Sequence, residues 1–154
     1  KKIDVLVNNA GIAIKGTADI KTEDFEKIIK INLLGAFYVM HEVVPYMKQQ
    51  RSGHIINMAS TAAKDARANL GAYAASKFGL AGYSDALFKE LADFNIDVST
   101  LCPGMVATEM SDGSPIPDTE KIQPEDIAES IEYILKLSQH AIVKEIVIKC
   151  RKKI

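Results

Sequence analysis

Apolar residues in this chain gather in four short runs, and longer segments with helical periodicity separate these runs. Most of the runs lack strict alternation of apolar and polar residues, as is typical of parallel strands covered on both faces. They predict strands at Ile3 to Val7, His54 to Met58, Ile96 to Leu101 and Glu145 to Ile148. The helical patterns span Lys21 to Lys48, Gly71 to Phe94 and Pro124 to Leu137. This alternation predicts an α/β fold with a parallel sheet and right-handed crossovers.

One long segment between a strand and a helix shows neither pattern. It runs from Met105 to Gln123 and contains Gly113, Pro115 and Pro117. A loop of this length in a compact domain is more often functional than idle. Ligands of open α/β sheets bind outside the carboxyl ends of the strands, so we expect this loop to border the binding site.

Composition is that of a soluble globular domain. Hydrophobic residues make up 47% and charged residues 25% of the 154 positions, near ordinary averages. We therefore expect residues 1–154 to form one domain or part of one. The net charge of −1 gives no electrostatic reason for a nucleic-acid or membrane partner. No apolar run reaches the length of a membrane span, and the basic end at 150–154 is expected to be a solvated tail.

Cysteine and histidine positions favour no metal site. Cys102 and Cys150 are too few and too far apart for a zinc pattern. His41, His54 and His140 show no i, i+4 pairing. Cys102 ends an apolar run, which indicates a small buried hydrophobe rather than a reactive thiol. Two unmatched thiols fit a reducing compartment, so a cytoplasmic protein is expected.

The candidate chemistry lies in four residues: Asn32, Ser60, Tyr73 and Lys77. Tyr73 and Lys77 are one helical turn apart, and Ser60 precedes the tyrosine by thirteen positions. A tyrosine phenol ionises near pH 10, but an ammonium one turn away favours its anion, as does a helix N-terminus. Tyr73 with a pKa lowered toward neutral could then exchange a proton with a carbonyl or alcohol oxygen, while Ser60 hydrogen-bonds that oxygen.

Each of these residues also has an ordinary structural interpretation. A helical tyrosine is usually packed, a helical lysine is usually solvated, and Asn32 could face solvent. Asparagine is otherwise unfavourable within a helix, because it competes locally with the backbone. The occurrence of all four residues together favours catalysis.

Five segments, in order, resemble the short-chain dehydrogenase/reductase family. They are Asn8-Asn9-Ala10-Gly11, Asn32, Met58-Ala59-Ser60, Tyr73 with Lys77, and Pro103-Gly104-Met105-Val106-Ala107-Thr108. The resemblance implies a doubly wound, Rossmann-type parallel sheet. The glycine-rich dinucleotide fingerprint of that fold does not occur in this sequence. We therefore expect the chain to be the C-terminal portion of a longer polypeptide, whose preceding part carries the pyrophosphate-binding turn.

The resemblance also implies roles for individual residues. Lys77 would hold the nicotinamide ribose, and Asn32 would position a water in a proton relay. The resemblance places further residues around the cofactor: Asn8, Ala10 and Gly11 on the adenosine side, and Pro103, Gly104, Val106 and Thr108 at the nicotinamide carboxamide. The same segments could instead be plain turns after strands. The implied cofactor is NADP or NAD, with NADP favoured because reductive members often use it.

The predicted function is an NAD(P)-dependent oxidoreductase that acts on a ketone, an aldehyde or a secondary alcohol. A 3-oxoacyl-carrier-protein reductase is one subclass, and the Met105 to Gln123 loop would select the substrate. A non-catalytic nucleotide-binding or regulatory subunit is the alternative. An epimerase or dehydratase fits the motif set less well. Lys64, Asp65, Arg67 and Asn69 between the motifs either face solvent or favour a polar substrate.

Assembly is predicted from the two long helices, because they carry apolar residues on more than one face. The residues in excess of one buried stripe are Phe78, Leu80, Tyr83, Leu87, Phe88 and Leu91. In the family the corresponding helices meet their counterparts in a second subunit. We expect a two-fold homodimer interface through these helices, within a homotetramer, unless these residues are scattered surface positions.

Overall fold

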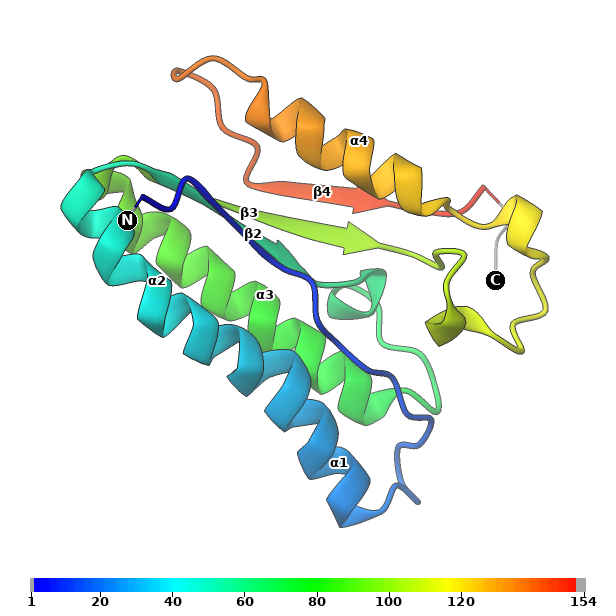
Figure 1. The fold of residues 1–154 in the computed structure, drawn as a ribbon. Coiled ribbons are helices and arrows are strands. Elements are labelled where there is room, and N and C mark those ends of the chain that lie inside the picture. Colours follow the sequence, from blue (N-terminus) through cyan, green and yellow to red (C-terminus); the bar gives the residue numbers. More distant parts are fainter. Residues whose placement is uncertain (1, 152–154) are drawn as a thin grey trace.

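The computed structural model describes residues 2–151, so the last three positions of the predicted tail lie outside the described residues. Four parallel strands form one sheet in the order β1-β2-β3-β4. They are β1 (Val5–Asn8), β2 (Gly53–Met58), β3 (Ile96–Pro103) and β4 (Glu145–Ile148). A helical crossover follows each of the first three strands (Figure 1). The predicted α/β class and parallel sheet are confirmed.

Helices cover both faces of the sheet (Figure 1). On one face lie α1 (Thr22–Ile29), α2 (Ala36–Gln50) and α3 (Gly71–Leu91), and on the other lies α4 (Pro124–Leu135). Gln123 and Asp126 form a capping box at the start of α4, and Pro124 occupies its first turn. The proline-and-acid pattern marks the helix start because proline has no N–H to leave unpaired there.

The alternation of side chains along the central strands builds one core on each face. Ile55 and Val98 point to the first core, which contains buried residues of α2 and α3. Ile56 and Leu101 point to the second core, where they pack against Ile134 of α4. Each fully buried aliphatic side chain contributes about 1.5–3 kcal/mol. Both cores hold the carboxyl ends of β2 and β3 in place.

The edge strands are less covered than the sequence pattern predicts. Val5 and Val7 of β1 are 39% and 40% exposed, and Val147 of β4 is 43% exposed. Their neighbours Leu6 and Ile146 pack into the first and second core respectively. Within residues 2–151, the prediction that both faces of a strand are covered is therefore confirmed for β2 and β3 and wrong for β1 and β4.

Predicted boundaries shift where tertiary contacts intervene. The first strand begins at Val5 rather than Ile3, because the Ile3 backbone bonds to the Gln50 side chain, at 2.8 Å in both directions. The helix predicted from Lys21 to Lys48 is interrupted by a π-helical segment, Lys30–Gly35. The helix predicted from Gly71 to Phe94 ends as a 3-10 turn over Ala92–Phe94.

One helix is long and apolar enough, by length and average composition alone, to be a candidate membrane span, although no uninterrupted apolar run of that length occurs in the sequence. Residues Thr22–Gln50 form 29 helical residues, with a mean hydropathy of 1.3 over the most apolar window. Length and composition alone are weak evidence for a membrane span. The same helix buries Met40 and Met47 against the sheet and carries the polar Asn32, so part of its apolar surface belongs to the domain core.

The outward apolar surface also differs from the predicted set. On α3 the core buries Leu80, Leu87 and Leu91, and only Phe78 of the named residues remains strongly exposed, at 46%. Tyr83 and Phe88 lie at the edge of the core. More of the exposed apolar surface belongs to α2, through Tyr38, Val39 and Tyr46.

Candidate active site

Three chain segments meet at the carboxyl ends of the strands. The Asn8 side chain at the end of β1 donates to Asn57 Oδ1 in β2, at 2.8 Å. Past β2, Ser60 Oγ donates to the Pro103 carbonyl oxygen at 3.4 Å. Backbone pairing extends the contact, because Ala59 N–H donates to the Leu101 carbonyl oxygen at 2.7 Å. The segments expected to form the binding rim therefore lie side by side.

Ser60 lies where β2 passes into a short 3-10 turn, Thr61–Ala63. Its backbone is extended, and its hydroxyl oxygen accepts the Ala62 N–H at 3.1 Å. The residue is only 7% exposed. This capping role fixes the hydroxyl at the sheet edge beside α3.

Tyr73 is the third residue of α3 and lies half-buried in its first turn. The loop between β1 and α1 positions this turn, because Gly71 N–H donates to the Gly16 carbonyl oxygen (3.2 Å) and to Thr17 Oγ1 (3.0 Å). Thr17 was not among the predicted site residues. A threonine in the loop after β1 gives no local signal for capping a helix that begins 54 positions later.

Lys77 lies one turn after Tyr73, with 4% of its surface exposed. Its ammonium donates to the Met58 carbonyl oxygen at 2.8 Å and lies 5.7 Å from the centroid of the Tyr73 ring. The ordinary interpretation of a solvated lysine is therefore wrong. The ammonium is held beneath the tyrosine, at the end of β2.

The ionisation of this pair differs from the prediction. Burial raises the pKa of Tyr73, and a hydrogen bond with the Ser60 side chain only partly opposes this rise. Burial also lowers the pKa of Lys77 to about 8, with a smaller opposing effect from Cys102. The predicted lowering of the Tyr73 pKa is wrong for this structure, because desolvation of the phenolate outweighs its stabilisation. The phenol therefore rests in its neutral form.

Asn32 lies in the π-helical segment and is 1% exposed, so it does not face solvent. Its side-chain oxygen accepts the Ile12 N–H at 2.8 Å. Its amide nitrogen donates to the Ile12 carbonyl oxygen at 2.9 Å and to Ser76 Oγ at 3.1 Å. These three bonds use both N–H donors and one of the two acceptor sites of the amide, and they fasten the loop after β1 to α3.

Ser76 is a second residue that the sequence analysis missed. It is fully buried and donates to the Tyr73 carbonyl oxygen at 2.7 Å while it accepts from Asn32. Its position three residues after Tyr73 was visible in the sequence. Its partner Asn32 lies 44 positions away, so only the fold reveals the contact.

Gly11 lies where the loop after β1 approaches the side chains of Asn32 and Lys77. A Cβ atom at this position would lie 3.3 Å from Asn32 Oδ1 and 3.4 Å from Lys77 Nζ. The first distance is tighter than most Cβ contacts, so the Asn32 side chain would have to shift by a few tenths of an ångström, whereas the second is close to ordinary van der Waals contact. The glycine therefore leaves room beside Asn32 and the Lys77 ammonium.

The Asn8 contact continues into a buried polar network that the sequence analysis did not identify. Asn57 is fully buried, and its amide donates to Ser84 Oγ in α3 at 2.8 Å. Ser84 in turn donates to the Leu80 carbonyl oxygen at 2.7 Å. Buried polar groups are costly unless paired, so this network specifies how β1, β2 and α3 pack.

The remaining predicted cofactor residues lie around the same rim. Pro103 is buried, and Gly104 N–H donates to the Ile148 carbonyl oxygen at 2.7 Å. Val106 forms an isolated parallel bridge with Ile122. Ala10 and Thr108 are exposed. In this rim, Pro103 is thus buried, whereas Ala10 and Thr108 are exposed to solvent.

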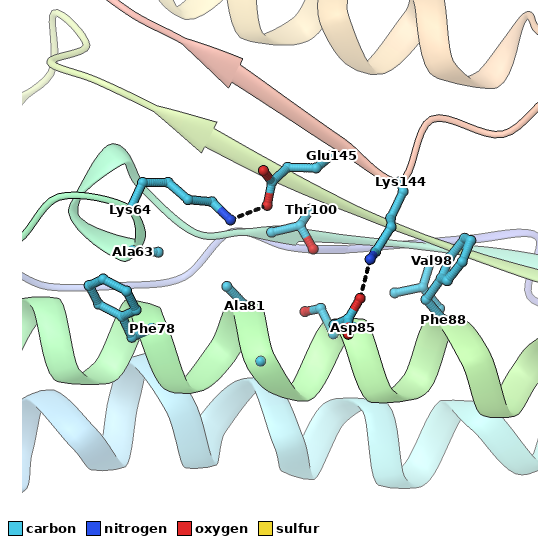
Figure 2. Close-up of a pocket in the computed structure, with 12 residues that line it drawn as sticks. Ala63, Lys64, Phe78, Ala81, Asp85, Phe88, Val98, Thr100, Lys144 and Glu145 are labelled. Carbon is cyan, nitrogen blue, oxygen red and sulfur yellow. Dashed lines mark ion pairs between the residues drawn. The ribbon is translucent and has the colours of Figure 1, made fainter.

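A cavity of about 570 Å³ lies apart from these residues, between α3 and strands β3 and β4 (Figure 2). Two ion pairs cross it, Lys64 with Glu145 at 2.5 Å and Lys144 with Asp85. Neither Ser60 nor Tyr73 lines it, so it is separate from the candidate active site. Lys64, Asp65, Arg67 and Asn69 are exposed, which supports their interpretation as solvent-facing residues.

Cys102 is completely buried beside Ala59 and Ala63, as predicted for a small hydrophobe. Burial raises the pKa of its thiol, which keeps the thiol neutral. Over residues 2–151, no three histidine, cysteine, aspartate or glutamate side chains are grouped to hold a metal ion.

A family model and individual known proteins are similar to this chain. Residues 1–117 match the family model described as short chain dehydrogenase. An uncharacterized oxidoreductase of Staphylococcus saprophyticus is 35% identical over 149 residues, which are 96% of this chain and 64% of that protein.

Two solved structures share the fold. A betaketoacyl-[ACP] reductase from Bacteroides thetaiotaomicron is 36% identical, with a TM-score of 0.81 over 97% of this chain and 62% of that one. A metagenomic short-chain oxidoreductase in complex with NADP is 30% identical, with a TM-score of 0.80 over 97% of this chain and 62% of that one. The chain spans less than two thirds of the length of these relatives. The sequence match and the shared fold together show that the chain belongs to the short-chain dehydrogenase/reductase family.

Proposed function

We propose that this chain carries the catalytic portion of an NAD(P)-dependent oxidoreductase that reduces a carbonyl group to an alcohol. One observation carries the proposal. Ser60, Tyr73 and Lys77 meet at the carboxyl ends of the strands, and Asn32 is bonded into the same cluster through Ser76. A pure binding site does not require a hydroxyl, a phenol and a buried ammonium together.

The described residues fit the nicotinamide end of such a cofactor. Lys77 has three ammonium hydrogens, and one is bonded to Met58, which leaves donors suited to ribose hydroxyls. Gly11 leaves the adjoining space open. When bound, the nicotinamide supplies or accepts a hydride. We favour NADP, because the metagenomic relative is described with NADP bound.

Tyr73 is suited to act as the general acid. Its raised pKa keeps the proton on the phenol at neutral pH, ready for the oxygen of a carbonyl that gains a hydride. Ser60 can donate to the same oxygen and stabilise its developing negative charge. The added hydride and the phenol proton together convert the carbonyl to an alcohol, and the tyrosine is left as phenolate.

Lys77 would assist when Tyr73 gives up its proton. An ammonium 5.7 Å from the ring centroid stabilises the phenolate that forms. A lysine pKa of about 8 also allows this group to return a proton near neutral pH. The neutral phenol already carries the proton that reduction of a carbonyl consumes. Oxidation of an alcohol would run the same proton transfer in reverse, with the phenolate as the base.

We further propose a 3-oxoacyl thioester or ester as the substrate class, since the Bacteroides thetaiotaomicron structure is a reductase of this kind. We also propose that the protein is cytoplasmic and that it forms a homotetramer. The Tyr38, Val39 and Tyr46 surface of α2 supports an assembly through this helix.

The test is NADPH oxidation by the full-length protein, with ethyl acetoacetate as the probe substrate and Tyr73→Phe as the matched variant. We expect turnover in the wild-type protein and nearly none in the variant, at equal NADPH affinity. Binding of NADPH without turnover would support the alternative of a non-catalytic subunit.

A further inference from the structure

The loop between β3 and α4 is closed on itself by backbone bonds near its two ends. Ala107 N–H donates to the Ile122 carbonyl oxygen at 2.8 Å, and Ile122 N–H donates to the Met105 carbonyl oxygen at 3.1 Å. Ile116 and Ile122 are buried at 6% exposure each. The loop is therefore a compact unit rather than an open strap.

A charged side chain lies inside this unit. The Lys121 side chain is 2% exposed, although it carries an ammonium group. Its Nζ donates to Asp118 Oδ1 at 2.6 Å, to Ser111 Oγ at 2.8 Å and to the Ser111 carbonyl oxygen at 3.0 Å. All three ammonium hydrogens thus have acceptors from the chain itself. A buried charge is tolerated only when it is paired in this way, so the loop must close around it.

Gln123, two positions after Lys121, ties the ammonium site to a helix. Gln123 Nε2 donates to the carbonyl oxygens of Asp118 (2.8 Å) and Lys121 (3.0 Å). The backbone N–H of Gln123 donates to Asp126 in the capping box of α4, at 2.7 Å. Since α4 packs on the second core through Ile134, the loop is anchored to a fixed part of the fold.

Lys121 also connects to the rim. Ser111, which accepts two of its hydrogen bonds, donates through its hydroxyl to the Thr108 carbonyl oxygen at 2.9 Å. The Ser111 N–H donates to the same oxygen at 2.8 Å. Thr108 lies one residue beyond Ala107, whose N–H closes the loop. The position of the ammonium therefore decides where the 106–108 segment lies.

We infer that Lys121 is a positioning residue for the nicotinamide-facing segment Val106 to Thr108. It acts through Ser111, because its buried ammonium spends all three hydrogens on acceptors within the loop. Its loss frees the loop, so the protein binds the cofactor less tightly and retains its proton-transfer residues unchanged. The cofactor part of this inference rests on the proposed function, whereas the loop closure does not.

The test compares Lys121→Met with Lys136→Met in the full-length protein. Lys136 is the matched control, because it forms an exposed ion pair with Glu132 on α4 at 2.5 Å. Hydrogen exchange at Ala107 and Ile122 should be at least about tenfold faster in Lys121→Met, with exchange at Ile55 and Ile56 of β2 unchanged. KM for NADPH should rise about tenfold while kcat changes less than about threefold.

Asp118→Asn provides a second route, since the Asp118 side chain is 73% exposed and its replacement has the same shape. This variant should speed exchange at the same two amides even where Lys121→Met does not fold. Unchanged exchange at Ala107 and Ile122 would overturn the inference, as would acceleration that extends equally to β2. A wild-type protein without NADPH turnover would contradict the proposed function, and the exchange data would still decide whether Lys121 closes the loop.

Discussion

The Lys77 ammonium of α3 donates a hydrogen bond to the carbonyl oxygen of Met58, 2.8 Å away, at the last residue of β2. This bond joins the catalytic helix to the strand that leads into Ser60. It also explains why a lysine can be buried here, since one acceptor replaces part of its lost hydration. The contact therefore fixes the position of the Lys77 ammonium relative to the end of β2.

Tyr73→Phe should remove nearly all NADPH-dependent turnover while the fold and NADPH binding persist. The phenylalanine keeps the ring but has no proton to transfer. Steady-state kinetics with thermal melting as the folding control will check this. Near-normal turnover in the folded variant would contradict the assignment of Tyr73 as the acid.

Ser60→Ala should reduce kcat by less than Tyr73→Phe does. A hydroxyl that stabilises charge on the substrate oxygen contributes about 2.7–4 kcal/mol to transition-state stabilisation. The Ala62 N–H also loses its acceptor, so a small fall in melting temperature is expected. A kcat equal to that of the wild type would mean that Ser60 only caps the turn after β2.

Lys77→Met should change how stability depends on pH. The folded-state pKa of Lys77 is about 8, below the ordinary value of 10.5. Between these values the unfolded chain holds a proton that the folded chain lacks, so the free energy of unfolding rises with pH in this window. Replacing the lysine should remove about 2 kcal/mol of that rise between pH 7 and pH 10.

Urea unfolding of both proteins at these two pH values will measure the difference. The other titrating groups are shared, so their contributions cancel in the comparison. Parallel pH dependences in the two proteins would show that Lys77 keeps an ordinary pKa. The variant should also bind NADPH more weakly, which fluorescence titration can detect.

Gly11→Ala should reduce kcat/KM on the order of tenfold, because the added methyl group displaces Asn32 or Lys77 by a few tenths of an ångström. Gly82→Ala in α3 is the control, since nothing lies within 4 Å of its added Cβ. That control should keep full activity and gain roughly 0.5–1 kcal/mol of stability. Equal activity in the two variants would contradict a tight fit at Gly11.

The full-length protein should be at least a dimer in light scattering at micromolar concentration. Tyr38 and Tyr46 are 55% and 50% exposed on α2, so replacing both with lysine should lower the measured mass to that of a smaller assembly. Met110→Lys, at a residue 51% exposed in the loop before α4, is the control and should leave the mass unchanged. A wild-type protein with the mass of a monomer would end the proposal.

The sequence by itself determined the element types and the residues that meet at the strand ends. Apolar runs and helical periodicity depend only on neighbouring residues, so they predicted the four parallel strands and the helices that connect them. The order of the motifs then placed Ser60, Tyr73 and Lys77 on the rim. Strand ends at one edge of a parallel sheet must lie together.

The tertiary structure alone decided how those residues are held and ionised. Asn32 and Ser76 are 44 positions apart, Lys77 reaches Met58 across 19, and no local pattern encodes such pairs. Burial sets the direction of the pKa shifts of Tyr73 and Lys77, and at Tyr73 that direction opposes the prediction from the spacing. Spacing reports which charges are neighbours, whereas the cost of removing water from them depends on everything that packs around them.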